Sequence, residues 1–135
     1  MALPSGPVPS FQKGSRLLNG SDVQKLADLI GSVQLIPVAT AGGTALNSIQ
    51  INAAMVEVAS VASANDGVVL PLGYPGLLII VANADASDSL RVFTKGSDVV
   101  NAAATQFDVA NLKRAMFFCV KKVGAIAQWY TILTA

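Results

Sequence analysis

The sequence contains no histidine, only one cysteine and only one tryptophan. Without histidine the chain lacks the usual general base, the serine and cysteine triads and the ligand of most zinc and iron sites. A single cysteine also leaves no internal disulfide and no thiolate zinc cluster. Because Cys119 lies in the apolar run AMFFCVKK with no histidine nearby, we expect a buried and unreactive thiol.

Charged residues are also scarce. The chain has nine Lys and Arg residues and eight Asp and Glu residues, so its formal net charge is +1. A charge this close to zero gives no electrostatic reason to expect a nucleic acid partner. Hydrophobic residues make up 53% of the chain and charged residues 13%, a more apolar composition than that of a typical soluble domain. A small monomer of this composition would expose much apolar surface, and such surface usually marks an interface. We therefore expect the chain to be part of an oligomer, with its apolar surface covered by other copies of the chain or by a larger partner.

A long apolar run is missing as well. The longest, GLLIIVANA, is far shorter than the ~20 residues of a membrane helix. The beginning of the chain, MALPSGPVPSFQKGS, has proline and glycine where a signal peptide has an apolar block. These features predict a soluble, unprocessed chain with no membrane partner.

The acidic residues form no recognisable catalytic or metal-binding arrangement. Most of them lie in expected turns or caps, where short acidic side chains bond to local backbone, and nothing in their spacing selects a pair for glycoside hydrolysis. The segment NADASD (83–88) imitates a calcium loop, but Asp88 stands where glycine is needed and Thr94 where glutamate is needed. Gly73 and Gly76 are not followed by the Gly-Lys-Ser/Thr of a phosphate-binding loop. We therefore predict no catalytic residue, no metal and no cofactor.

Residues 1–33 are predicted to form an extended arm and one short helix. Pro4, Pro7 and Pro9 each fix φ and remove an amide donor, which excludes a helix or a central strand. Such an arm is either an unstructured terminus or a docking arm that lies in a partner's groove.

The helix is predicted over Asp22–Ile30. Ser21 can cap it together with Gln24, and Gly31 fits the left-handed exit position. Its apolar face comprises Val23, Leu26, Ala27 and Ile30. A helix this short is not stable alone, so this face must pack against something.

Residues 34–135 are predicted to form an all-β domain. Short runs rich in Val, Ile, Leu and Thr alternate with turns such as 65–67 and 73–76, at a spacing of roughly ten residues. About seven or eight strands result, the first of them an edge strand in VQLIPVA, because proline is tolerated there. This pattern predicts an antiparallel β-sandwich, jelly-roll-like, or a barrel.

Several of these strands are apolar on both faces. Leu77, Ile79 and Val81 alternate with Leu78 and Ile80, and the run AMFFCV has the same character. Antiparallel sheets usually leave one face polar and solvated, so a second apolar face implies a second cover. One face fills the core and the other meets a subunit. The candidates for this interface are Leu78, Ile80, Phe118, Trp129 and Tyr130, of which Trp129 and Tyr130 point to opposite faces of the last strand.

Three segments in a fixed order resemble a family of small bacteriophage virion proteins. They are GVVLP, then GLLIIVANADASDSLRVFTKGSDVVNAAA, then AMFFCVKKVGAIAQWYTI. In that family a V-x-L-P strand follows a turn glycine, and a strand ending V-x-N-A precedes S-x-x-V-[FY]-x-x-x-G-D-x-[IV]-N, F-x-C-V and a last strand with tryptophan. The matching residues are Gly67, Leu70, Pro71, Asn83, Ala84, Ser89, Val92, Phe93, Asp98, Val100, Asn101, Phe117, Cys119, Val120 and Trp129. Here Ser97 separates Gly96 from Asp98, where many relatives place the two together. The segment GSRLLNGSDVQKLADLI is similar to the N-terminal part of phage head-decoration proteins.

The resemblance implies an all-β virion domain, made in the host cytoplasm and usually a homotrimer. It would decorate and stabilise the outer surface of the capsid by binding the major capsid protein. The parts that dock on the capsid would then be the proline-rich arm and the capped helix, and the β domain would form the trimer. The docking residues would be Pro4, Pro7, Pro9, Phe11, Leu17 and Leu18. The turn at 96–101 would reverse the chain, with Asp98 and Asn101 bonding to neighbouring amides.

Two other functions stay open. A head- or tail-fibre base or receptor-binding module would carry a fibrous extension, and this sequence contains none. A small lyase or hydrolase would need a catalytic arrangement, and the sequence has no histidine, no plausible metal site and no carboxylate pair that its spacing selects.

Overall fold

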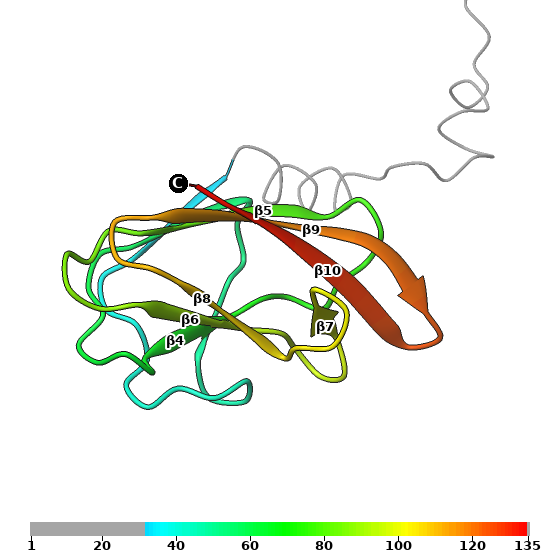
Figure 1. Ribbon diagram of the computed structural model, residues 1–135, viewed down its shortest axis with the longest axis horizontal. Helices are drawn as coiled ribbons and strands as arrows, with labels where there is room; N and C mark the ends of the chain where they lie inside the picture. Colours follow the sequence, from blue (N-terminus) through cyan, green and yellow to red (C-terminus); the bar gives the residue numbers. More distant parts are fainter. Residues whose placement is uncertain (1–31, 135) are drawn as a thin grey trace, which may run out of the picture.

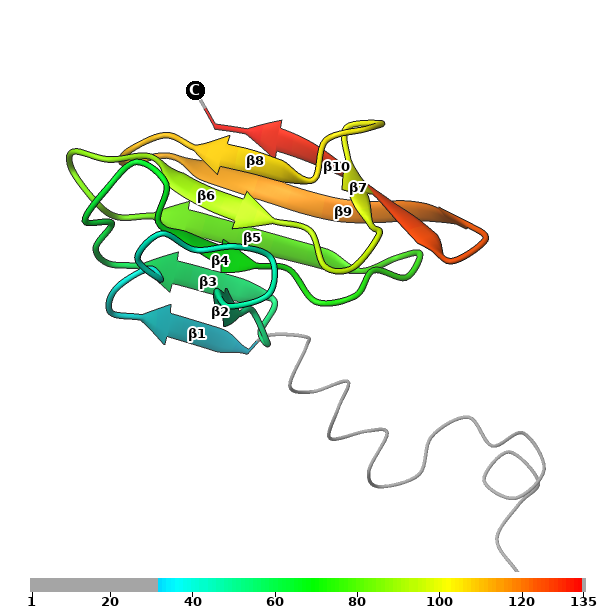
Figure 2. The same cartoon turned by 90° about the horizontal axis from the view of Figure 1, so that it is seen from below.

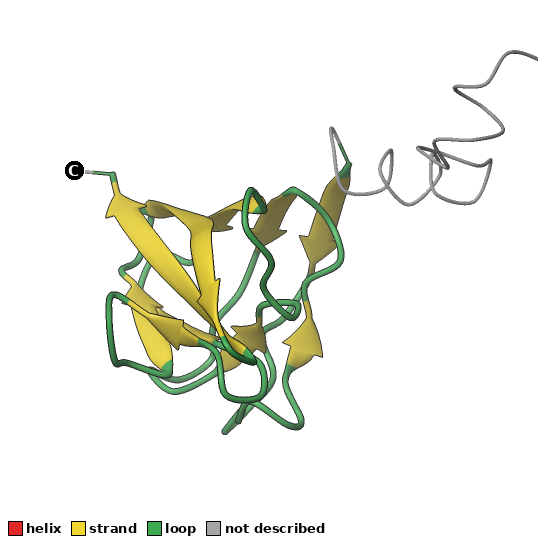
Figure 3. Cartoon of the chain, turned by 90° about the vertical axis from the view of Figure 1, so that its right-hand side faces the viewer, coloured by secondary structure: helices red, strands yellow, loops and turns green. Residues whose placement is uncertain are grey.

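The computed structural model describes residues 32–134, and regular structure in this range consists of ten β-strands. The strands form two sheets in two layers, joined by loops (Figures 1 and 3). The prediction of an all-β domain is confirmed for these residues. The predicted arm and the predicted helix Asp22–Ile30 lie outside the described residues. Between residues 32 and 134 no helix is long and apolar enough to cross a membrane.

The larger sheet has six strands and the smaller has four. Figure 2 shows the strands of the two sheets lying over one another. In spatial order the larger sheet contains β1 (Val33–Ile36), β3 (Met55–Val58), β5 (Leu78–Asn83), β9 (Arg114–Val123), β10 (Ile126–Leu133) and β7 (Val99–Val100). The smaller contains β2 (Ile49–Gln50), β4 (Gly67–Val69), β6 (Leu90–Phe93) and β8 (Gln106–Val109).

The chain alternates between the two sheets from β1 to β6. Each strand therefore pairs with the strand two places along the chain, and these pairs are parallel: β1 with β3, β3 with β5, β2 with β4, and β4 with β6. β10 and β7 are also parallel, whereas β5–β9, β9–β10 and β6–β8 are antiparallel. The predicted antiparallel arrangement holds for the last three pairs and is wrong for the others. Alternation of apolar residues reports which side of a strand is buried, not the direction of its neighbour.

The predicted edge strand is confirmed, because β1 lies at one edge of the larger sheet. It ends at Ile36, one residue before Pro37. The predictions missed two short strands, β7 and β8. β7 has only two residues, and in β8 only Val109 is fully buried, so neither shows an extended alternating pattern.

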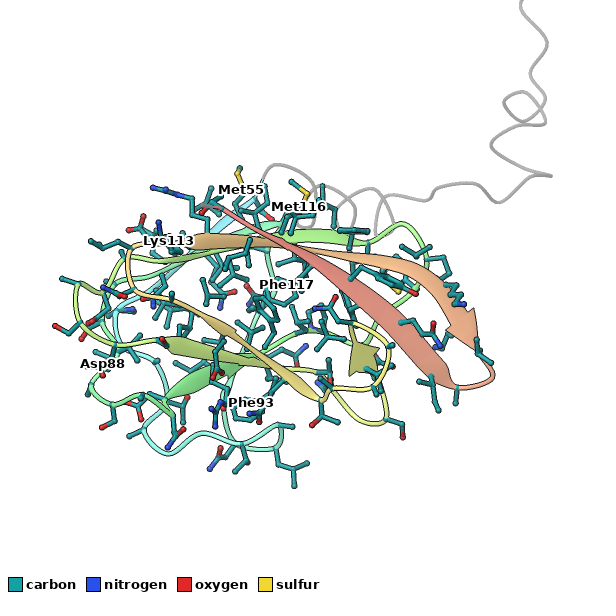
Figure 4. The ribbon with its side chains drawn as sticks, viewed as in Figure 1. Met55, Asp88, Phe93, Lys113, Met116 and Phe117 are labelled. Carbon is teal, nitrogen blue, oxygen red and sulfur yellow. The ribbon has the colours of Figure 1, made fainter. Side chains whose placement is uncertain are left out.

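The core lies between the two sheets. Its largest fully buried side chains are Trp129, Phe117, Ile51, Leu70, Ile79 and Leu90. Phe117 projects from β9 toward the smaller sheet (Figure 4), where its ring meets that of Phe107 edge to face, with centroids 5.8 Å apart. Such aromatic pairs favour one arrangement of the sheets beyond the apolar area that they bury.

Candidate docking surface

The outer side of the larger sheet, which faces away from the smaller sheet, carries a continuous line of apolar side chains. The strand register places five residues next to one another across five strands: Val33, Met55, Ile80, Met116 and Ile132. We call them the first row. Met55 and Met116 project from this outer side in Figure 4, whereas Phe117 projects inward. Val33 is 60% exposed and Ile132 is 59% exposed, so the row is open to solvent at both ends.

A second row lies beside the first, two residues along each strand. It joins Leu78 of β5, Phe118 of β9 and Tyr130 of β10. The rings of Phe118 and Tyr130 stack with their centroids 6.1 Å apart and their planes inclined by 25°. Leu78 remains 45% exposed beside them. The two rows together are called the outer apolar face.

The opposite outer surface has a different character. On the smaller sheet, the Arg91 guanidinium of β6 donates two hydrogen bonds to the Asp108 carboxylate of β8, at 2.8 and 3.0 Å. Lys95 contacts the side-chain oxygen of Gln50 on the same sheet. Solvated polar pairs of this kind are typical of a sheet face in contact with water. The apolar surplus predicted from the sequence is thus concentrated on the larger sheet.

A hollow of about 300 Å³ opens on the outer apolar face near β1. Its lining includes Val33, Met55, Ile80, Ala82, Glu57 and Arg114. The floor is apolar, and Glu57 and Arg114 lie in the neighbouring register row through Ala82. Burying one more large apolar side chain on such a surface stabilises a complex by about 1.5–3 kcal/mol. Contact with an apolar partner would therefore stabilise this surface.

Four of the five predicted interface residues lie on the outer apolar face. Leu78, Ile80, Phe118 and Tyr130 all occupy outward positions of β5, β9 and β10. Trp129 is fully buried in the core, so its assignment to an interface is wrong. The sequence placed Trp129 and Tyr130 on opposite faces correctly but did not decide which of them is core.

Sequence reasoning missed the other members of the first row: Val33, Met55, Met116 and Ile132. Met116 stands at an alternate position in AMFFCV, which was predicted as apolar on both faces, and this pattern was the available signal. Ile132 lies two residues after Tyr130 and therefore on the same side of the last strand. Val33 and Met55 join the row only through the parallel pairing of β1, β3 and β5. The predicted docking residues Pro4, Pro7, Pro9, Phe11, Leu17 and Leu18 lie outside the described residues.

The turn before β7 holds β10 in place. The Asp98 carboxylate is buried and accepts hydrogen bonds from the Gly73 amide at 2.7 Å and from the Ala127 amide at 2.9 Å. The prediction that Asp98 bonds to neighbouring amides is wrong, since both donors are far along the chain. Gly96 has a φ of +61°, which agrees with the expected tight turn. A Cβ at Gly73 would lie 2.6 Å from that of Ala127, so only glycine fits this approach.

Asn101 ties the same turn to β10. Its side-chain amide donates to the Thr131 hydroxyl at 2.8 Å, and its side-chain oxygen accepts from the Thr131 amide at 3.1 Å. The expected local hydrogen bonding of Asn101 is therefore also wrong. Because Thr131 directly follows Tyr130 in the chain, these contacts hold the backbone beside Tyr130 and so orient this end of the second row.

The loop after β5 is organised around Asp85. Its carboxylate accepts hydrogen bonds from the amides of Val61, Ser87 and Asp88, and these bonds lower the pKa of Asp85. Both carboxylate oxygens thus serve the backbone. Asn83 is buried beside it and donates to the carbonyls of Asp88 and Val109. In the part of the chain that the structure describes, no three acidic or cysteine side chains gather as a metal site would require.

Cys119 provides a test of the packing between the sheets. Its thiol is buried, and burial, reinforced by the negative charge of Asp98, raises its pKa above the ordinary value of 9.0. We expect a thiol reagent at pH 8 to label the folded protein more than about tenfold more slowly than the protein in denaturant, because both access and the thiolate fraction are reduced. The protonated Cys119 thiol contributes to the free energy of unfolding. This contribution is fully present below the pKa that the thiol has in the unfolded chain. It is lost as the pH rises through the higher pKa of the thiol in the folded protein.

The measurement is the labelling rate with and without denaturant. Cys119→Ser is the control and takes up no reagent, since the sequence has no other cysteine. Equal labelling rates in the two conditions would show that the thiol is not held in the core.

Comparison with known protein families gives no match, and no curated protein matches the chain.

Proposed function

We propose that this chain is a non-enzymatic structural protein of a bacteriophage virion, a capsid decoration protein that trimerises and binds the assembled head. The outer apolar face carries this proposal, because it supplies a surface that sister chains or a shell would cover. The resemblance of the segments after Gly67 to small virion proteins supports the same conclusion. The proposal includes a β-sandwich domain preceded by an extended arm and one short helix.

The proposed mechanism is mechanical. Homotrimers sit on the outer surface of the capsid where its subunits meet, and they bind the assembled shell but not free subunits. Ligands that bind only one state stabilise it by mass action, so the shell becomes harder to dissociate. Three copies of a docking arm in each trimer add weak contacts through multivalency.

Within the trimer, the second row meets the sister chain. Leu78, Phe118 and Tyr130 combine two aromatic rings with a half-exposed leucine, and buried aromatic side chains dominate the energy of many interfaces. A stable interface generally buries more than about 1,000 Å² in total, so neighbouring positions of the sheet would take part as well.

Co-sedimentation tests the decoration role. We expect the protein to sediment with empty shells and not with free capsid protein, because the docking site spans several assembled subunits. Deletion of residues 1–15 should weaken shell binding and leave the trimer intact. A protein that sediments with neither shells nor capsid protein would contradict the proposal. Binding to a fibre component instead would favour a head- or tail-fibre base or receptor-binding module.

A further inference from the structure

The described chain enters the larger sheet beside the first row. The Ser32 carbonyl accepts a hydrogen bond from the Met55 amide at 3.2 Å, so the chain is already paired with β3 at this point. The next residue, Val33, is the first member of the row and is 60% exposed. Ile30, the last residue of the predicted helix, is three residues before Val33, which limits their Cα separation to about 11 Å.

The predicted helix and this part of the sheet have matching needs. Val23, Leu26, Ala27 and Ile30 form an apolar face that must pack, since a helix over 22–30 is not stable alone. Within residues 32–134, the apolar surface over β1, β3 and β5 is left open, and Met55 on it is 42% exposed.

The dimensions also agree. A helix over 22–30 is about 13 Å long. β1, β3 and β5 span about 10 Å from the first to the third strand, and the four residues of β1 extend about 13 Å. The hollow of about 300 Å³ lies within this area and is lined by apolar side chains of Val33, Met55 and Ile80. An isoleucine or leucine side chain of the helix can enter it.

The short connection between the predicted helix and β1 favours packing of the helix on its own chain over packing on a sister chain. Only Gly31 and Ser32 separate Ile30 from Val33, and Ser32 is fixed against β3. We propose that residues 22–30 form a helix that packs on the β1–β3–β5 part of the outer apolar face of the same chain. The second row, with Leu78, Phe118 and Tyr130, then stays open for a sister chain. This inference does not depend on the proposed virion function.

Hydrogen–deuterium exchange on the full-length chain tests the docked helix. We expect the amides of residues 25–30 to exchange at least about tenfold more slowly than in an unstructured peptide. Met55→Glu places a charge on the docking surface, and Leu26→Asp places one on the helix. Each should remove this protection while the amides of β5 and β9 stay protected. Leu46→Glu is the matched control, since Leu46 lies in the loop before β2 and is 98% exposed, and it should change nothing.

Three outcomes would overturn the inference. The first is exchange of residues 25–30 at the unstructured rate in the unmodified protein. The second is protection that both charge substitutions leave intact. The third is protection that disappears on dilution together with the oligomer, because a sister chain would then supply the contact. Leu26→Asp alters no residue of the sheet, so the test remains decisive if Met55→Glu disturbs the β domain. The assay contains no shells, so its result is separate from that of co-sedimentation.

Discussion

Replacing Asp98 with alanine is expected to lower the free energy of unfolding by roughly 2–6 kcal/mol, because two buried amides would each lose their acceptor at about 1–3 kcal/mol. These amides, of Gly73 and Ala127, belong to the β4–β5 connection and to β10. The Asp98 carboxylate therefore joins three segments that are distant in the sequence. Urea denaturation followed by circular dichroism measures the effect.

Asp98→Asn and Asp108→Ala are the matched controls. Asparagine keeps the shape and one acceptor, so its effect should be intermediate. Asp108 lies on the solvated side of the smaller sheet, with its side chain 43% exposed in its ion pair with Arg91. Loss of such an exposed pair costs about 0–1 kcal/mol. If Asp98→Ala were no more destabilising than Asp108→Ala, the carboxylate would not hold the turn to β10.

Phe118→Glu is expected to convert the proposed trimer into monomers. The substitution removes the ring that stacks on Tyr130 and puts a charge in the middle of the second row, next to Leu78. Truncating a central aromatic residue typically costs about 2 kcal/mol or more at each interface, and a trimer repeats that interface. The side chain is only partly buried in one chain, so the fold itself should survive. Light scattering gives the mass, which should fall from three chains to one.

Leu46→Glu controls for the added charge, because it changes an exposed leucine outside the outer apolar face. It should leave the mass unchanged. An unmodified protein that is already monomeric in dilute buffer, or a Phe118→Glu variant that stays trimeric, would remove the second row as the interface.

The outward side of β5 could be predicted from the sequence, whereas that of β10 could not. In β5, Leu78, Ile80 and Ala82 face outward while Ile79, Val81 and Asn83 face inward, as period-two alternation requires. The apolar residues on both sides of β5 also indicated that its outward side packs against another subunit. Alternation is a local property, so reading it requires no knowledge of the neighbouring strand.

The partners of the turn at residues 96–101 could not be predicted in this way. Asp98 and Asn101 belong to types that usually bond to their own backbone. Here Asp98 reaches amides 25 and 29 residues away, and Asn101 reaches Thr131, 30 residues away. Which amides come within reach depends on how the strands stack, and no local pattern encodes that.

By itself, the sequence determined that the chain contains no histidine, the usual general base and a frequent metal ligand, that its main strands are apolar, and that several are apolar on both faces. Only the tertiary structure decided that Val33 and Met55 join Ile80, Met116 and Ile132 in one row, and that Trp129 belongs to the core while Tyr130 faces outward. The physical reason is that side-chain polarity fixes what must be buried, whereas register and parallel pairing fix which distant residues are buried together.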